Sequence, residues 1–271
     1  MIGNLSALML GVMEGLTEFL PISSTAHLVL ASDLLGIAQS NFAKTFEIAI
    51  QSGAILAVLA LYWRKFLDPA VLKKLLAAFL PTAVIGLAFY KLVKTYLLGN
   101  TAVILAALAA GGALMIAAEY AFKNRPGGSR AAKEAAVIGP APARMEEVTY
   151  QKAFSVGLFQ SVAMVPGVSR SAATILGGML LGISRETIVE FSFLLAVPTM
   201  LAATALDLLK NLDAFSSAEF SVLAIGAAAS FVTAIIGIKL LLRYIKKNTF
   251  IGFGVYRIAL AVLVTVLFLG R

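Results

Sequence analysis

Six long apolar segments constrain the fold of this chain more than any other feature. They lie at residues 46–63, 75–90, 101–118, 191–206, 220–242 and 251–269. An α-helix needs about 20 apolar residues to cross a hydrocarbon core of about 30 Å, so each segment has roughly the length of a span. Charged residues make up 13% of the sequence, against about 25% in a soluble domain. The chain is therefore predicted to be an all-α polytopic membrane protein.

Basic residues collect in the connections between these segments. Residues 46–63 are followed by Arg64, Lys65, Lys73 and Lys74, and residues 220–242 by Arg243, Lys246 and Lys247. This placement is typical of cytoplasmic loops, so the net charge of +8 indicates membrane orientation and no nucleic-acid partner. The polar segment 123–152 is also basic and is predicted to be a cytoplasmic linker. The absence of cysteine from the sequence excludes disulfides, thiolate nucleophiles and cysteine-bound zinc.

Two further apolar regions are too short to cross a bilayer as single helices. Residues 5–20 and 28–37 flank Pro21-Ile-Ser-Ser, where the proline ends one helix and the serines offer capping oxygens for the next. Two short helices joined in this way predict a re-entrant hairpin over residues 5–37, with protein or water around its turn. Residues 154–182 show the same pattern around Pro166-Gly-Val-Ser-Arg-Ser and predict a second hairpin.

An internal repeat relates the two halves of the chain. Sliding the sequence by 146 positions (157 − 11) aligns, without a gap, Gly11 with Gly157, Ser23 with Ser169, Ala26 with Ala172, and residues 34–37 with 180–183. Each half, residues 1–122 and 153–271, would hold one re-entrant hairpin and three transmembrane helices. Because three is odd, the halves are predicted to be inverted repeats. With the basic connections inside, both termini and the mouth of the first hairpin face the outer side.

Two acids and an arginine stand out in the hairpins, because an ionisable group at the bilayer centre costs roughly 2.5–3.5 kcal/mol. Glu14 and Glu18 are spaced i, i+4, which places both carboxylates on one helix face. A divalent cation such as Mg²⁺ would remove their repulsion, so both are candidate metal ligands, with phosphates completing the coordination. The alternative is a structural role beside neighbouring hydroxyls. Arg170 is a candidate for bidentate phosphate binding, or else it reaches toward water from a helix end.

Hydroxyl groups and the single histidine cluster at the same two turns. His27 is a candidate general acid or nucleophile, or a packing residue. Six hydroxyl residues form two clusters at matching repeat positions and are candidate phosphate ligands. They are Ser23, Ser24, Thr25, Ser169, Ser171 and Thr174. Glu47, Gln51 and Glu190 are interpreted as packing or supporting residues.

Three stretches closely resemble signature motifs of the undecaprenyl-diphosphate phosphatase family, which is linked to bacitracin resistance. They are Glu14-Gly-Leu-Thr-Glu18, Pro21-Ile-Ser-Ser-Thr-Ala-His27 and Pro166-Gly-Val-Ser-Arg-Ser-Ala-Ala-Thr174. The stretches that begin at Gln51 and Glu190 are similar too, so the likeness covers essentially the whole chain. The resemblance implies a bacterial enzyme of the cytoplasmic membrane that removes one phosphate from undecaprenyl diphosphate, recycling the lipid carrier of cell-wall synthesis. It also implies a site that depends on a divalent cation, Mg²⁺ or Ca²⁺, and faces the outer side.

The chain departs from the commoner family pattern at Ala26 and Ala172, where many members carry glycine. If those turns need a left-handed residue, alanine would fit them poorly. The chemical groups of the motifs are all retained, so the departure concerns the geometry of the turns.

The expected reaction is hydrolysis of a membrane-embedded prenyl diphosphate, which depends mainly on positioning and charge neutralisation. The expected catalytic residues are Glu18, Ser24, His27 and Arg170, with the nucleophile left open between Ser24, His27 and water. Glu14 and Glu18 would bind the metal, or one of them would act as base. The alternative function is a transporter or flippase of a phosphorylated prenyl lipid, because inverted repeats with re-entrant helices are transporter architecture. The expected partners are the substrate and membrane lipid, and a homodimer is also open.

Overall fold

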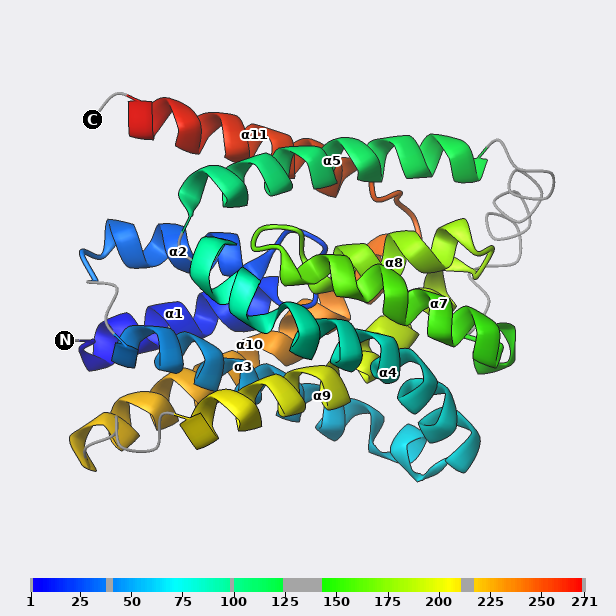
Figure 1. Ribbon diagram of the computed structural model, residues 1–271, viewed down its shortest axis with the longest axis horizontal. Helices are drawn as coiled ribbons and strands as arrows, with labels where there is room; N and C mark the ends of the chain where they lie inside the picture. Colours follow the sequence, from blue (N-terminus) through cyan, green and yellow to red (C-terminus); the bar gives the residue numbers. More distant parts are fainter. Residues whose placement is uncertain (1, 38–40, 98–99, 124–142, 211–216, 270–271) are drawn as a thin grey trace.

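The computed structural model describes residues 2–37, 41–97, 100–123, 143–210 and 217–269, and every regular element within these ranges is helical. The first half contains α1 (Asn4–Thr17), α2 (Ser24–Leu34), α3 (Asn41–Tyr62), η1 (Trp63–Leu67), α4 (Pro69–Leu92), η2 (Val93–Leu97) and α5 (Thr101–Lys123). The second half contains η3 (Met145–Glu147), α7 (Tyr150–Ser161), η4 (Val162–Met164), α8 (Arg170–Leu180), α9 (Arg185–Lys210), α10 (Ser217–Ile245) and α11 (Ile251–Leu269). Figure 1 shows how these helices are arranged.

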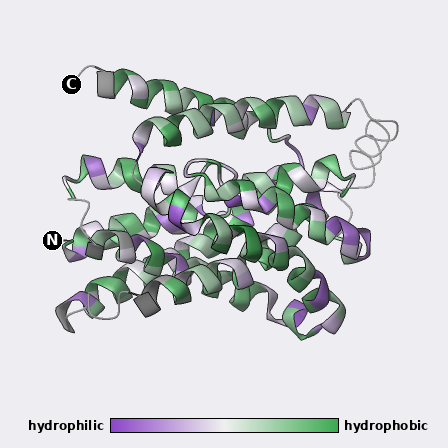
Figure 2. Cartoon of the chain, viewed as in Figure 1, coloured by the Kyte–Doolittle hydropathy of each residue, from purple (hydrophilic) through white to green (hydrophobic). Residues whose placement is uncertain are grey.

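Five helices in the described residues are long and apolar enough to cross a membrane: α3 with η1, α4, α5, α9 and α10. The remaining predicted span, residues 251–269, coincides with α11, whose apolar run Ile251–Leu267 is shorter than the other five. Apolar residues cover these helices along their length (Figure 2). On α4 an exposed apolar stripe includes Leu72, Leu76, Leu80, Val84 and Leu87. Such a face suits lipid, and the prediction of an all-α multi-pass membrane protein is confirmed.

The predicted cytoplasmic linker is too long at its C-terminal end. Residues 124–142 of this segment lie outside the described residues. Helix α7, however, begins at Tyr150, within the predicted linker 123–152. The helix starts early because the side chain of Thr149 caps it by accepting a hydrogen bond from the Lys152 amide at 3.3 Å.

Helices pair across the two halves of the sequence. Helix α1 packs along α10, and α7 packs along α4, while α3 contacts α9 and α5 contacts α11. Figure 1 shows α5 and α11 together along one side of the molecule. Two glycines at matching repeat positions allow close approaches: a Cβ at Gly11 would overlap the carbonyl of Gly226, and one at Gly157 the carbonyl of Ala78. The absence of a side chain therefore brings α1 onto α10 and α7 onto α4.

The turn between each pair of short helices, α1 with α2 and α7 with α8, is closed by a serine in the left-handed region. Ser23 (φ 72°) precedes α2 and Ser169 (φ 73°) precedes α8. Their hydroxyl oxygens accept hydrogen bonds from the Ala26 amide at 3.4 Å and the Ala172 amide at 3.2 Å. Ala26 and Ala172 need no left-handed backbone, because both lie inside helices and the unusual backbone falls on the serines. A capping side chain offsets the cost of that conformation.

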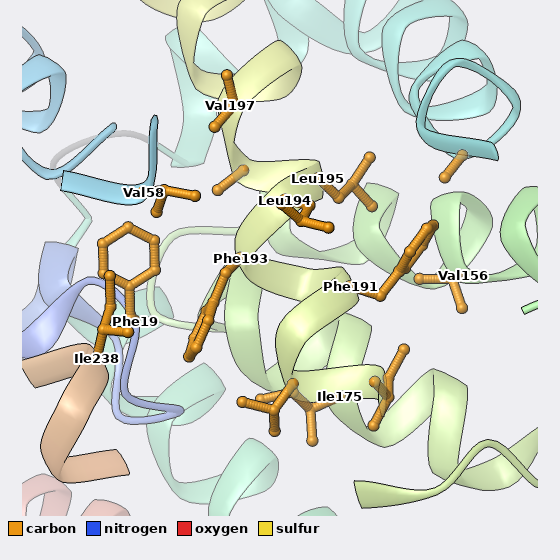
Figure 3. Close-up of a cluster of buried hydrophobic side chains, with 14 of the residues drawn as sticks. Phe19, Val58, Val156, Ile175, Phe191, Phe193, Leu194, Leu195, Val197 and Ile238 are labelled. Carbon is orange, nitrogen blue, oxygen red and sulfur yellow. The ribbon is translucent and has the colours of Figure 1, made fainter. Parts of the chain in front are cut away.

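A cluster of buried aromatic and aliphatic side chains lies behind the turns (Figure 3). The rings of Phe19 and Phe193 meet edge to face, with centroids 5.3 Å apart. Phe19 follows Glu18 directly, and the Arg170 guanidinium lies 5.6 Å from the centre of the Phe19 ring. Aromatic packing of this kind holds the backbone at Glu18 in one position.

Candidate active site

A polar cavity of about 170 Å³ lies where the turn before α2 and the turn before α8 meet. Its polar lining consists of Glu18, Ser23, Ser24, Thr25, Gln51, Ser169 and Arg170. The first turn and α2 supply three hydroxyls, and the second turn and α8 supply a hydroxyl and a guanidinium. Six of the ten residues predicted for the site therefore line one cavity. Glu14, His27, Ser171 and Thr174 lie outside its lining.

Glu18 joins the two halves at the centre of this cavity. Its Oε1 atom accepts a hydrogen bond from Nη2 of Arg170 at 3.0 Å, and the two groups form a salt bridge. Its Oε2 atom accepts a hydrogen bond from the hydroxyl of Ser24 at 2.5 Å. One carboxylate thus connects the hydroxyl of its own hairpin with the guanidinium of the other hairpin. Charge-assisted hydrogen bonds of this kind are short and strong.

Arg170 is held on three sides. Besides Glu18, its Nη1 atom donates to the carbonyl oxygen of Ser192 at 2.8 Å, and its guanidinium lies over the Phe19 ring. Its Nε atom is buried and has no hydrogen-bond partner among the described residues. The guanidinium is therefore fixed in orientation and keeps its Nε donor unused, which suits recognition of an anion.

Glu14 has a different environment. Its side chain is fully buried, and neither carboxylate oxygen has a hydrogen-bond partner among the described residues. Its electrostatic neighbours are Glu18, Glu47 and Arg170. A buried carboxylate without a partner is costly unless a cation or a proton accompanies it. Glu14 therefore fits a cation ligand placed behind the cavity.

His27 uses both ring nitrogens within the protein. Its Nδ1 atom lies 2.8 Å from the carbonyl oxygen of Ser23, and its Nε2 atom lies 2.7 Å from the hydroxyl of Tyr256. Because a carbonyl only accepts, Nδ1 is the donor, and a neutral imidazole then accepts at Nε2 from Tyr256. The histidine thus holds the backbone of the left-handed Ser23 and does not line the cavity.

Ser171 and Thr174 contact neighbouring segments. The hydroxyl of Ser171 donates to the carbonyl oxygen of Leu20 at 2.9 Å and so joins the second hairpin to the first. The hydroxyl of Thr174 lies 2.6 Å from that of Ser192, the residue whose carbonyl holds Arg170. Both hydroxyls support the walls of the cavity from outside.

The remaining acids in the spans have partners of their own. Glu47 accepts a hydrogen bond from Ser32 at 3.0 Å, and Glu190 forms a salt bridge with Lys65 at 3.1 Å. Neither lines the cavity. The sequence reasoning assigned Gln51 to the same supporting class, but Gln51 reaches the cavity. Gln51 could have been recognised from the sequence, because it begins a stretch that is similar to the family.

Sequence reasoning also missed Tyr256 and Arg257 of α11. Tyr256 bonds His27, and Arg257 is completely buried between the two turns. The signal was an arginine in the middle of the apolar segment 251–269, because such a residue is costly unless it has a defined partner.

Comparison with known proteins identifies the chain. Residues 7–263 match the family described as bacitracin resistance protein BacA. An undecaprenyl-diphosphatase of Sulfurihydrogenibium sp. (strain YO3AOP1) is 48% identical over 260 residues, which cover 96% of this chain and 97% of that protein. The undecaprenyl-diphosphatase of Aquifex aeolicus is 44% identical, covering 97% and 98% of the two chains. That of Bdellovibrio bacteriovorus is also 44% identical, covering 97% and 95%. With its motifs gathered at one cavity, the chain belongs to the BacA family of bacitracin resistance proteins.

Proposed function

We propose that this chain is an integral membrane phosphatase that hydrolyses undecaprenyl diphosphate to undecaprenyl phosphate and inorganic phosphate. The names of the relatives and their nearly complete coverage of the chain support this activity. The observation that carries it is the contact of Glu18 with both Ser24 and Arg170. A hydroxyl, a carboxylate and a guanidinium around one cavity are the groups that phosphoryl transfer needs. The product would serve cell-wall synthesis again as lipid carrier.

Ser24 is the proposed nucleophile and Glu18 its general base. The hydroxyl of Ser24 donates to Glu18 at 2.5 Å, a distance suited to proton transfer. In the first step, Ser24 Oγ attacks the terminal phosphorus, Glu18 takes the hydroxyl proton, and undecaprenyl phosphate leaves with the bridging oxygen. In the second step, water attacks the phosphoserine and inorganic phosphate leaves. The Ser24 hydroxyl regains its proton through Glu18.

Arg170 and the helix ends would bind the terminal phosphate. The phosphate would compete with Glu18 for the guanidinium, whose Nε donor is unused among the described contacts. Helices α2 and α8 are both capped at their N-termini by serines that line the cavity, so their N-terminal amides and dipoles favour an anion there. Charge on the terminal phosphate would then be balanced from both halves of the chain.

Glu14 would hold a divalent cation, Mg²⁺ or Ca²⁺, next to the site, with Glu18 as a second ligand once the terminal phosphate has displaced it from Arg170. The two oxygens of Glu14 without protein partners support this assignment, because hard cations take carboxylate ligands. The described residues contain no group of three or more His, Cys, Asp or Glu side chains arranged for a metal. Phosphate oxygens and water would complete the shell. The cation would supply neutralisation of the diphosphate charge.

We also propose that the two halves are inverted repeats about the shared cavity. The exchanged helix pairs, α1 with α10 and α7 with α4, support this relation. So do the matching left-handed serines and close-approach glycines. In Figure 1 the start of α1 and the end of α11 lie on one side, and the basic α3–α4 connection lies on the other. With the basic end in the cytoplasm, both termini would lie on the outer side of the cytoplasmic membrane, and we propose that the lipid head group enters the cavity from that side, as the family resemblance implies.

Phosphate release by the purified protein in detergent tests the function. A detergent micelle has no two sides, so a transporter or flippase without hydrolytic activity releases no phosphate from undecaprenyl diphosphate. We expect many turnovers from the wild type, and a loss of at least about 10²-fold in Glu18→Gln, Ser24→Ala and Arg170→Lys.

Matched substitutions away from the cavity serve as controls. Glu186→Gln, Ser155→Ala and Arg243→Lys make the same chemical changes at partly or fully exposed positions of α9, α7 and α10. These variants should keep wild-type turnover. No release from the wild type would refute the activity. Near-normal turnover in Glu18→Gln would refute the assigned base, and near-normal turnover in Ser24→Ala would make water the nucleophile.

A further inference from the structure

Arg257 of α11 is the largest fully buried side chain in the described residues, and the proposed reaction does not use it. Its Nε atom donates to the carbonyl oxygen of Leu108 at 3.2 Å. Its Nη1 atom donates to the carbonyl oxygens of Pro21 and Val168 at 3.2 and 3.0 Å. Its Nη2 atom donates to those of Ala107 and Gly167 at 3.2 and 3.0 Å. A guanidinium has five N–H donors, and here each has its own carbonyl acceptor.

The charge of Arg257 is balanced by these carbonyl dipoles. Among the described residues no carboxylate forms a salt bridge with Arg257, whereas Arg170 pairs with Glu18. A buried charge is retained only where its hydrogen bonds are complete, so loss of several of them is strongly destabilising. The five acceptors must therefore stay in place around the guanidinium.

The acceptors come from three separate segments, and two of them are the turns that form the cavity. Pro21 lies two residues before the capping Ser23, and Val168 directly precedes the capping Ser169. Gly167 itself lines the cavity. In a trans peptide the carbonyl and the following N–H point in opposite directions, so fixing the Val168 carbonyl also fixes the Ser169 amide. Helix α5 supplies the third segment through Ala107 and Leu108.

We propose that Arg257 is a positioning residue for the phosphatase site: it ties the two re-entrant turns to each other and to α5 without touching the substrate. The proposal rests on the proposed function for its catalytic consequence. The tie itself is a structural property that can be measured without substrate. It acts on Ser24 and Arg170 through the turns that precede them.

Arg257→Lys is the first test, because lysine keeps the charge but has three donors for five carbonyls. We expect kcat to fall about 10²-fold, the effect of misplacing reacting groups by about 1 Å. KM for the lipid should change less than about threefold, because Arg257 is completely buried and does not touch the substrate. Hydrogen exchange of residues 19–24 and 164–170 should become faster, with α3 and α9 as protected as in the wild type.

Gly111→Ala is the second test and leaves every polar group in place. A Cβ at Gly111 would overlap Nη2 of Arg257 and force the guanidinium to move. We expect the same pattern, with lower kcat and faster exchange in both turns. Gly86→Ala is the matched control, since its Cβ would lie 3.6 Å from the sulfur of Met164, an ordinary contact. It should behave as the wild type.

Each outcome decides the proposal. Unchanged kcat and unchanged exchange in Arg257→Lys and Gly111→Ala would overturn it. Faster exchange throughout α3 and α9, with activity lost in proportion to folded protein, would also overturn it, because Arg257 would then only stabilise the fold. If the wild type released no phosphate, the proposed function would fail, while faster exchange confined to the two turns would still establish the tie.

Discussion

Glu14 lies on α1 and Glu18 follows one helical turn later as the C-cap of that helix, yet their carboxyl groups have opposite surroundings. Both oxygens of Glu18 accept hydrogen bonds, whereas those of Glu14 have no partner among the described residues. Glu18 is therefore ready for proton transfer in the protein as it stands. Glu14 needs a cation or a proton to offset its burial.

Glu14→Gln removes this charge and keeps the volume. Without divalent cation, we expect unchanged or higher thermal stability, because an uncompensated buried carboxylate is lost. Phosphate release in saturating Mg²⁺ should fall about 10–100-fold, as when a metal site loses support. Mg²⁺ should raise the unfolding temperature of the wild type, and chelation should abolish its activity. An equal Mg²⁺-dependent rise in Glu14→Gln would contradict the assignment.

His27 separates two chemical roles that the sequence left open. The side-chain amide of asparagine can replace the Nδ1–H donor that holds the Ser23 carbonyl, but it cannot act as nucleophile or general acid. We expect His27→Asn to retain turnover within about tenfold of the wild type, and His27→Ala to lose more because the left-handed Ser23 is released. Turnover measured at saturating lipid decides. If both variants were equally inactive, His27 would be assigned a role as nucleophile or general acid.

At the scale of the element, glycine allows the first helix of each hairpin to pack closely against a long helix. Gly11 and Gly157 occupy matching repeat positions, and at each the backbone of a short helix reaches a carbonyl of a long one. A wider separation would move the turns away from each other, since each turn is carried by the short helix before it.

Gly157→Ala tests this dependence. The added Cβ would overlap the backbone carbonyl of Ala78, so α7 must move away from α4. We expect a loss of about 1–3 kcal/mol of stability from overpacking, although alanine favours the helix by about 0.5–1 kcal/mol. Thermal unfolding in detergent measures it. The control Gly86→Ala has room for its Cβ and should be neutral or stabilising, and the same loss there would contradict the packing argument.

The elements were largely predictable because membrane helices are encoded locally. Apolar length indicated α3, α4, α5, α9 and α10, and the Pro-Ile-Ser-Ser turn indicated the break between α1 and α2. The geometry of the turns was less accessible. A family comparison drew attention to Ala26, but the left-handed backbone falls on Ser23, where a side-chain cap compensates for it. Backbone conformation within a turn depends on contacts that composition does not report.

At the scale of the whole molecule, the site exists only where the two halves meet. The internal repeat placed an acid in the first turn and an arginine in the second, and Glu18 and Arg170 meet in the structure. The repeat could not reveal Arg257, because its five acceptors are backbone carbonyls, which leave no mark in the sequence. Nor could it show that Thr174 bonds Ser192 outside the cavity.

The orientation of the molecule can be tested with single cysteines, since the natural sequence has none. Gly3 precedes α1 and is exposed, and Lys73 is exposed near the basic α3–α4 connection. We expect a membrane-impermeant maleimide to label Gly3→Cys in cells whose outer face is accessible. Lys73→Cys should react only after the cytoplasmic membrane is opened. The reverse pattern would place the cavity on the cytoplasmic side.

The cavity between the turns measures only about 170 Å³, far too little to admit a chain of fifty-five carbons. We therefore expect the isoprenoid to stay outside this cavity, among the acyl tails, while its head group enters. Selection among lipids then has two parts: the bilayer retains the hydrocarbon, and the pocket binds only the anionic head group. Short diphosphates that partition weakly into lipid should be poor substrates because they seldom reach the opening, even though the pocket would hold their head group equally well.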